Sequence, residues 1–389
     1  MSSRNGFQVR FLLATNLPVS VTRITADTAN YFVLAGVPTT VLFPSVDWWE
    51  YRLFTIRRLP PAPRVKEIAK LAAQAAGAAL VRKSWCGLSD FKVDPRVRLR
   101  CFGSAPPLSW LEGGITVAQH TYVIARKLLL KKEGPRPVMV GALHVNLEKA
   151  TRSASPETAA WFRHWVGLEQ ELKIPRYATS EDSRQAAERL GIPVRRMIPG
   201  GIDLNLFSPA QRRLEAGLTV SLYCDPNKQK GRETGVEAIA GLKALAPGIR
   251  LCSIGPVTPE QGKRFDLNYG YLRGDRYVRA LQETDLFVYP SLYDGFPAPP
   301  LQAMACGAAL VTTAVEGVVE YARDGANCLL CPPGDAAALR DRTARLIGDP
   351  ALRARLRAEG LKTAQAFSAE RSAAELLGFL KEVYAQEAA

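Results

Sequence analysis

The side chains best placed to do chemistry lie in one short stretch, residues 285–307, which reads DLFVYPSLYDGFPAPPLQAMACG. Its first part, Asp285–Tyr289, is an apolar run that ends at a proline, and it predicts a short buried strand. A loop containing Gly295 follows. Pro300–Cys306 then predicts a helix, because a proline opens it and Gly307 closes it.

A glycine-containing loop that leads into a helix can bind an anion. Backbone N–H groups and the positive end of the helix dipole point at whatever lies there. Asp294 lies in the loop of this stretch, and Gln302 lies about one turn inside the helix. We therefore expect both side chains to face one ligand.

A second candidate anion site follows the predicted strand Leu218–Cys224. The loop DPNKQKG leads from this strand into a predicted helix, Glu233–Ala246, and it carries Lys228, Lys230 and Gly231. A lysine held beside a helix N-terminus can clamp a phosphate. The alternative is an ordinary surface lysine.

The stretch at 285–307 resembles the signature of retaining family 4 glycosyltransferases, which have the GT-B fold. In that family, two glutamates separated by seven residues flank the donor sugar and the nucleotide ribose. Asp294 and Gln302 hold these two positions here, again separated by seven residues, and both depart from glutamate. The other matches to the signature are Pro290, Ser291, Gly295, Phe296, Leu301, Ala303, Met304 and Gly307. The alternative is an ordinary strand–loop–helix of another α/β protein.

The resemblance implies transfer of a sugar from a nucleotide-sugar donor to an acceptor hydroxyl, with anomeric retention. The leaving diphosphate gains negative charge, which Lys230, Lys228 and the helix at Pro300 would stabilise without a metal or other cofactor. Asp294 would hold sugar hydroxyls, as would loop N–H groups. His144 follows the predicted strand Val138–Leu143, where the family commonly has a histidine beside the donor sugar.

The resemblance thus implies two catalytic residues, Asp294 and His144. The donor-binding residues that it implies are Lys228, Lys230, Gly231, Tyr271, Leu272, Gly295, Phe296 and Gln302. A glutamine at position 302 can accept hydrogen bonds from the ribose diol, but without charge. We expect donor binding to be weaker than with glutamate by about 1 kcal/mol. The position where the family has a phosphate-binding arginine holds Asp225.

The predicted fold class is α/β, of the GT-B type: two Rossmann-like domains with parallel sheets that face each other across a cleft. A strand, helix and strand at Val9–Thr15, Thr22–Ala35 and Thr39–Phe43 predict a βαβ opening of a parallel sheet. Ile115–Leu130 predicts a helix that ends at two lysines. The segment GGIDLNLFSP at 200–209 resembles the family's crossing into its second domain.

We therefore predict an acceptor-binding domain at 1–198 and a donor-binding domain at 199–368. A last helix, about 369–389, is expected to cross back to the first domain. Charge divides at the same point: residues 1–198 hold 29 Lys and Arg against 15 Asp and Glu, and residues 199–389 hold 22 of each. The excess of basic residues predicts an anionic partner on the first half. The alternative is a solvated, arginine-rich surface.

The seven cysteines are scattered and mostly lie in apolar runs, which predicts reduced core thiols and not a disulfide framework. Cys328 and Cys331 form a CxxC that lacks the second pair of a zinc site. The sequence has no membrane-length apolar run, and its first ten residues, MSSRNGFQVR, lack the apolar core of a secretory signal. We therefore expect a cytoplasmic protein that needs no metal. It would be peripheral to the inner membrane face if the anionic partner is lipid.

The acceptor is expected to be a glycan or glycolipid, anionic if the basic half contacts it, so the expected role is in cell-surface glycan or glycolipid synthesis. The sequence does not select the donor's nucleotide or sugar. The alternative function is a non-catalytic GT-B protein that binds a nucleotide sugar or an anionic glycan, because positions 225, 294 and 302 all depart from the family pattern. Nucleic-acid binding is disfavoured, because no recognisable RNA- or DNA-binding module accompanies the basic residues.

Overall fold

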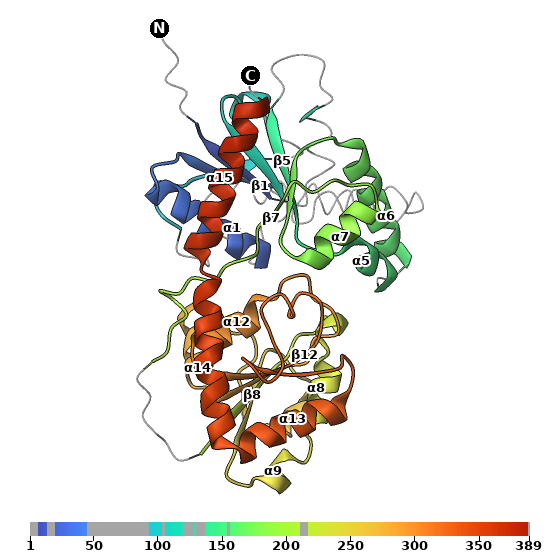
Figure 1. Cartoon of the computed structure of the whole chain (residues 1–389), viewed down its shortest axis with the longest axis vertical. Helices are drawn as coiled ribbons and strands as arrows, with labels where there is room; N and C mark the ends of the chain where they lie inside the picture. The colour runs from blue at the N-terminus through green and yellow to red at the C-terminus, as the bar shows by residue number, and fades with distance from the viewer. Residues whose placement is uncertain are drawn as a thin grey trace. The chain divides into compact units, whose positions relative to one another are not determined.

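The computed structural model describes residues 7–13, 20–44, 93–102, 106–119, 128–129, 137–153, 156–210 and 217–387. The chain divides into two units (Figure 1). The first unit comprises Met1–Pro199 and Glu370–Ala389, and the second comprises Gly200–Ala369. The division falls one residue from the boundary that the sequence predicts. The aromatic cluster at 47–51 and the predicted elements between 65 and 83 lie outside the described residues.

The described part of the first unit contains a seven-stranded parallel sheet in the order β3-β2-β1-β4-β5-β6-β7. Its first six strands have the Rossmann order. In sheets of this order, ligands bind at the carboxyl ends of the strands where the order reverses, which here is between β1 and β4. The strands are β1 (Val9–Leu13), β2 (Thr39–Pro44), β3 (Arg98–Phe102), β4 (Ile115–Gln119), β5 (Val138–Leu143), β6 (Arg176–Ala178) and β7 (Arg196–Met197).

Helices cover both faces of this sheet, because successive side chains of a strand point to opposite faces. Phe11 of β1 packs with α1 (Ser20–Leu34) and with α15 (Ala369–Glu387). Leu12 packs on the other face, where the helices α5 (Leu147–Ser153), α6 (Pro156–Glu171) and α7 (Glu181–Arg189) contribute to the core. The last helix is therefore part of the first unit's core, although it follows the second unit in the chain.

The second unit has six described strands, all parallel, in the order β10-β9-β8-β11-β12-β13. This is again the Rossmann order, with its reversal between β8 and β11. The strands are β8 (Thr219–Tyr223), β9 (Arg250–Ile254), β10 (Leu267–Asn268), β11 (Leu286–Tyr289), β12 (Ala309–Thr313) and β13 (Leu329–Cys331).

The side chains of β11 alternate between two apolar cores in the second unit. Leu286 and Val288 pack with α8 (Arg232–Ile239) and α13 (Ala336–Gly348). Phe287 and Tyr289 point to the opposite face, which α11 (Gly274–Gln282) and α12 (Ala298–Ala305) cover. Figure 1 shows α12 and α14 (Pro350–Ala366) on one side of this sheet and α8 and α13 on the other.

The helix predicted over Ile115–Leu130 is wrong at its start, because Ile115–Gln119 is the strand β4. This strand lies between β1 and β5, and all five of its residues are buried. The segment ITVAQ is rich in β-branched residues, and an apolar run of this length does not by itself distinguish a helix from a buried strand. The pairing with two neighbouring strands decided the outcome.

The helix predicted over Glu233–Ala246 is also wrong in its extent. It consists of α8, which ends at Ile239, and a short α9 (Leu242–Leu245). Gly241 stands between them with a φ of 83°, a left-handed conformation that a continuous helix excludes. The predicted elements at 9–15, 39–43 and 285–289 are strands, each displaced by at most two residues at an end.

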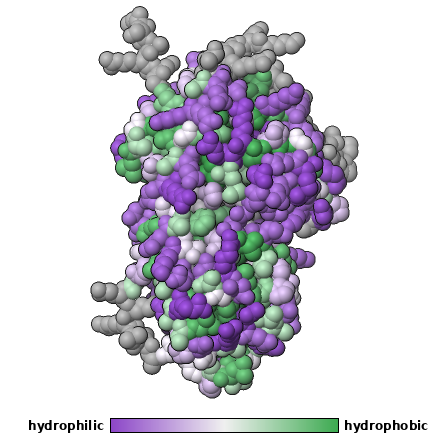
Figure 2. Space-filling model, viewed as in Figure 1, coloured by the Kyte–Doolittle hydropathy of each residue, from purple (hydrophilic) through white to green (hydrophobic). Residues whose placement is uncertain are grey.

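No helix among the described residues is both long and apolar enough to span a membrane. The face of the molecule in Figure 2 is largely hydrophilic, with apolar residues scattered among the polar ones.

Candidate functional site

Two loops meet where the strand order of the second unit reverses. One follows β8 and carries Lys230, and the other follows β11 and carries Asp294. In open α/β sheets, ligands bind outside the carboxyl ends of the strands at this reversal. The sheet order thus places the two candidate anion sites of the sequence side by side.

Gly231 allows the two loops to approach each other closely. Its φ is 66°, and a Cβ atom there would lie 2.0 Å from the carbonyl oxygen of Pro290. Main-chain hydrogen bonds join the loops as well, since the N–H groups of Leu292 and Tyr293 donate to the carbonyl oxygen of Gln229 at 2.8 and 3.2 Å. The position of Lys230 is therefore tied to the end of β11.

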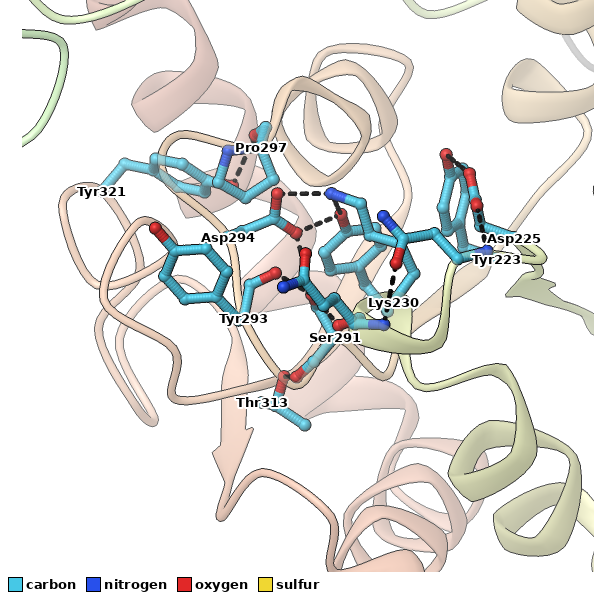
Figure 3. A network of polar contacts seen from close by, with 12 residues as sticks. Tyr223, Asp225, Lys230, Ser291, Tyr293, Asp294, Pro297, Thr313 and Tyr321 are labelled. Carbon is cyan, nitrogen blue, oxygen red and sulfur yellow. Dashed lines mark hydrogen bonds and ion pairs between the residues drawn. The ribbon is translucent and has the colours of Figure 1, made fainter. Parts of the chain in front are cut away.

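The carboxylate of Asp294 binds three side chains of the second unit (Figure 3). Lys230 Nζ donates to Oδ1 at 2.5 Å. The Tyr289 hydroxyl donates to Oδ2 at 2.6 Å, and the Ser291 hydroxyl lies 2.8 Å from the same oxygen. Asp294 is only 8% exposed, whereas the Lys230 side chain is 24% exposed. Lys230 is thus the more accessible member of a largely buried ion pair.

The loop that carries Asp294 is also held from the β12 side. The Thr313 hydroxyl donates to the carbonyl oxygen of Ser291, and the Gly317 N–H donates to that of Asp294 at 3.1 Å. A Cβ atom at Gly317 would lie 2.4 Å from the carbonyl oxygen of Gly295, so the absence of a side chain permits this approach. The carboxylate is therefore fixed through both its side chain and its backbone.

Three tyrosines, two of them buried, lie around the carboxylate, and all three stay neutral at physiological pH. Burial, reinforced by the nearby charge of Asp294, holds the pKa values of Tyr289, Tyr223 and Tyr321 well above their usual range. A neutral phenol keeps its proton and can donate it. Tyr289 uses its proton on Asp294, and Tyr321 donates to the carbonyl oxygen of Pro297 at 2.9 Å.

Gln302 lies on α12 and accepts a hydrogen bond from the Tyr277 hydroxyl at its Oε1, at 3.1 Å. The helix starts at Ala298, two residues before the predicted Pro300. Pro299 and Pro300 therefore occupy its first turn and lack the N–H groups that a helix start otherwise offers to an anion. The predicted anion site at this helix thus has fewer backbone donors than the sequence reading assumed.

The remaining predicted donor-binding residues differ in exposure. Lys228 and Tyr271 are exposed, and Tyr271 keeps 71% of its surface. Leu272 is partly buried against the core of the second unit. Gly295 is buried, and the ring of Phe296 packs on Tyr321 and Phe367.

Asp225 stands where the resembled family has an arginine, and the structure gives it a local role. Its Oδ1 accepts from the N–H of Asn227 at 2.8 Å, and its Oδ2 accepts from the Tyr223 hydroxyl at 3.4 Å. These bonds close the turn that leads to Lys228. The carboxylate of Asp225 thus shapes the loop that leads to Lys228 and Lys230.

The sequence reading missed two side chains of the site, the hydroxyls of Tyr289 and Tyr277. Tyr289 lies in the apolar run of a predicted strand, and Tyr277 lies in a segment to which the sequence analysis assigned no role. A signal for Tyr289 was available in its place at the carboxyl end of a predicted strand, where parallel sheets present functional groups.

His144 belongs to the first unit and follows β5 as predicted. Its Nε2 donates to Gln119 Oε1 at 2.9 Å, and Gln119 in turn donates to the Thr25 hydroxyl at 3.1 Å. Gln119 is the last residue of β4, so this chain of bonds lies at the strand-order reversal of the first sheet. Burial lowers the pKa of His144 to about 4, which keeps the imidazole neutral near pH 7.

The lowered pKa of His144 predicts a loss of stability in acid. Its unfolded value is 6.5 and its folded value about 4. As the pH falls from 6.5 to 4, the unfolded chain therefore takes up a proton that the folded chain refuses. We expect the free energy of unfolding to drop by about 1–3 kcal/mol over this window and to be unaffected by this group above it.

Urea unfolding of the wild type and of His144→Gln between pH 4 and pH 7 measures this effect. As the pH falls, the urea midpoint of His144→Gln should decline less than that of the wild type. His164 is an exposed residue of α6, and His164→Gln should show the same pH dependence of the midpoint as the wild type. Equal slopes for the wild type and His144→Gln would contradict the prediction.

The five cysteines whose surroundings the structure describes are buried free thiols: Cys224, Cys252, Cys306, Cys328 and Cys331. Burial raises the pKa of both CxxC thiols, Cys328 and Cys331, to about 12. Within the described ranges, no three His, Cys, Asp or Glu residues are grouped so that they could hold a metal ion.

Comparison with known proteins finds a family model that matches the part of the second unit containing Lys230 and Asp294. Residues 226–363 match the model of the family described as Glycosyl transferases group 1. Glycogen synthase from Mycobacterium tuberculosis is 26% identical over 253 residues, which are 60% of each chain. An N,N'-diacetylbacillosaminyl-diphospho-undecaprenol alpha-1,3-N-acetylgalactosaminyltransferase from Campylobacter jejuni is 38% identical over 79 residues, or 20% of this chain and 21% of its own. The chain thus spans about three fifths or less of the length of these relatives.

Solved structures match over nearly the whole chain. Sucrose-phosphate synthase from Thermosynechococcus elongatus has a TM-score of 0.71 at 18% identity, over 98% of this chain and all of its own. Anabaena HepE, solved with UDP and glucose, has a TM-score of 0.71 at 16% identity, over 97% of this chain and all of its own. These likenesses and the two Rossmann-ordered parallel sheets confirm the predicted GT-B fold class.

Proposed function

Because residues 226–363 match the model of the Glycosyl transferases group 1 family, we propose that this chain transfers a sugar from a nucleotide-sugar donor to an acceptor hydroxyl. The observation that carries the proposal is the ion pair of Lys230 and Asp294 at the strand-order reversal of that domain. An ammonium held at this edge of a sheet suits the diphosphate of a nucleotide.

In the proposed reaction, the bond between the anomeric carbon and the phosphate oxygen breaks, and the diphosphate leaves with the bonding electrons. The charge of Lys230 stabilises the growing negative charge of this leaving group. The oxygen of the acceptor hydroxyl bonds to the anomeric carbon, and its proton passes to the departing diphosphate. We propose that no metal ion takes part, because the ammonium of Lys230 can itself stabilise the charge of the diphosphate. Retention of the anomeric configuration is proposed on the resemblance of residues 285–307 to the signature of the retaining family.

We further propose that the acceptor is a glycan or glycolipid in cell-surface synthesis. The 29 basic residues against 15 acidic ones in residues 1–198 favour an anionic acceptor or a membrane surface beside it. The name of the Campylobacter relative includes a diphospho-undecaprenol acceptor, which belongs to this chemical class.

A thermal-shift panel of nucleotides and nucleotide sugars, without added metal, tests the donor part of the proposal. Binding to the folded state alone raises the melting temperature. A shift with one nucleoside diphosphate and with its sugar derivative is the expected result, and it supplies the donor for an acceptor screen. If none of them shifts the transition, the proposal fails.

A second candidate function is a non-catalytic GT-B protein that binds a nucleotide sugar or an anionic glycan. One observation favours it: the side chains of Asp294 and Gln302, expected to face the donor, are bonded to Lys230, Tyr289 and Tyr277. Mass spectrometry of a donor incubated with the protein separates the two functions. Release of free nucleoside diphosphate indicates catalysis, and an intact donor bound to the protein indicates binding alone.

Gln302→Glu is expected to tighten donor binding by about 1 kcal/mol, roughly fivefold in the dissociation constant. A carboxylate would accept the ribose hydroxyls with charge and would still accept the Tyr277 hydroxyl. Isothermal titration with the nucleotide selected by the panel measures the change. Gln365→Glu adds the same charge at an exposed position of α14 and should leave the affinity unchanged. Unchanged or weaker binding by Gln302→Glu would rule out contact with the ribose.

A further inference from the structure

We propose that Tyr289 is a positioning residue for the donor diphosphate, acting through Asp294 on the ammonium of Lys230. The inference rests on the proposed function, because it assigns the work of the same site. It gives Asp294 the role of holding Lys230, where the sequence reading had it hold the sugar. Figure 3 shows Asp294 directed toward Lys230.

The fold fixes the hydroxyl of Tyr289 in place. Tyr289 is the last residue of β11 and is fully buried. Its ring packs on Tyr223 with the ring centroids 5.1 Å apart. The phenol therefore cannot turn toward solvent, and its oxygen lies 2.6 Å from Asp294 Oδ2 and 3.5 Å from Lys230 Nζ.

The hydroxyl fixes the orientation of the Asp294 carboxylate. Because Tyr289 donates to Oδ2, the other oxygen, Oδ1, is directed to Lys230 at 2.5 Å. Ser291 serves the same Oδ2 less exclusively, since its single proton is shared among Asp294 and the carbonyl oxygens of Tyr293 and Gln229, at 2.8, 3.0 and 3.2 Å. Tyr289 is thus the more specific of the two hydroxyl donors to the carboxylate.

The arrangement leaves the lysine able to bind a ligand. An ammonium has three N–H donors. Asp294 accepts one of them and the Tyr289 hydroxyl, at 3.5 Å, accepts a second, so one remains for a ligand. The Lys230 side chain is 24% exposed, while Tyr289 and Ser291 are fully buried. An incoming diphosphate would therefore meet a lysine whose direction is already set, and it would lose less entropy in ordering it.

A double-mutant cycle tests the proposal on the full chain. UDP, GDP and ADP are titrated into the wild type, Tyr289→Phe, Lys230→Met and the double variant, and the corresponding nucleosides are titrated in parallel. We expect Tyr289→Phe to weaken diphosphate binding about fivefold to tenfold with nucleoside binding unchanged. In the Lys230→Met background the same change should have no further effect, because the group it positions is gone.

Two controls keep a structural effect apart from a positioning effect. Tyr384→Phe removes a tyrosine hydroxyl of the first unit, which accepts from the Gly114 N–H at 3.3 Å, and it should leave all affinities unchanged. If Tyr289→Phe does not fold, Asp294→Asn tests the same chain of contacts, with the same dependence on Lys230. Urea midpoints of every variant establish that the protein is folded in the assay.

The outcomes separate this inference from the function on which it rests. If the wild type binds none of the three diphosphates, the proposed function fails, and this inference fails with it. If the wild type binds one of them but Tyr289→Phe binds it equally well, only the inference is overturned. The inference would also be overturned if Tyr289→Phe weakened diphosphate binding as much in the Lys230→Met background as in the wild type. The same holds if Tyr289→Phe weakened nucleoside binding as much as diphosphate binding.

Discussion

Gly231→Ala is expected to lower the free energy of unfolding of the second unit by more than about 3 kcal/mol, the largest stability effect predicted for a single substitution here. The residue has a φ of 66°, which strains any side chain, and the new Cβ would lie 2.0 Å from the Pro290 carbonyl oxygen. The Cβ would be attached to the backbone of one loop and would meet the backbone of the other. The clash can therefore be relieved only by moving one of the two loops of the site. Urea unfolding followed by circular dichroism measures the loss, and diphosphate binding should fall with it.

The chain offers a matched control at Gly241, which also has a left-handed φ, of 83°, and also precedes a helix in the second unit. Nothing lies within 4 Å of the Cβ that an alanine would add there. Gly241→Ala should therefore cost only the backbone strain, about 1 kcal/mol. If both substitutions cost the same, the close approach of Gly231 to Pro290 contributes nothing beyond its backbone conformation.

Lys230→Met is expected to weaken nucleoside diphosphate binding by about 10-fold to 100-fold, the largest functional effect. Methionine keeps the length of the side chain but lacks the charge and the N–H donors. The substitution also leaves the carboxylate of Asp294, which is 8% exposed, without its ammonium partner. We expect a stability loss of about 1–3 kcal/mol, below that of a fully buried pair because Lys230 is partly exposed.

A second substitution separates these two effects. Adding Asp294→Asn to Lys230→Met removes the unpaired charge, so it should recover part of the lost stability without restoring diphosphate binding. Lys243→Met breaks an exposed ion pair with Asp266 in the same unit, and it should change stability by less than about 1 kcal/mol and leave binding intact. Diphosphate affinity equal to the wild type in Lys230→Met would remove the basis of the proposed function.

Local patterns in the sequence were enough to predict most of the strands and helices of the second unit. The strand, loop and helix at 285–307 follow from an apolar run and from the glycines and prolines close to it in the chain. The structure places the strand and the helix within two residues of the prediction. The parallel sheets follow from the alternation of strands and helices. These features depend on residues that are close together in the chain, so they can be predicted from the sequence.

The elements that the sequence misjudged are those whose surroundings lie far along the chain. Ile115–Gln119 became a strand because β1 and β5 pair with it on both sides, and these partners are contributed by residues 9–13 and 138–142. The segment 233–246 was divided at Gly241, where a left-handed backbone ends the regular helix. The sequence of a single apolar run does not reveal whether distant segments of the chain will pair with it as strands.

For the site, too, the sequence determined one part and the tertiary structure the other. The sequence by itself determined which groups are present: a lysine beside a helix start, an aspartate in a glycine-containing loop, and a histidine after a strand. Only the tertiary structure decided that Lys230 and Asp294 bond to each other and that Tyr289 directs the carboxylate. The physical reason is the order of the strands, because β8 and β11 are neighbours in the sheet while these two residues are 64 positions apart in the chain.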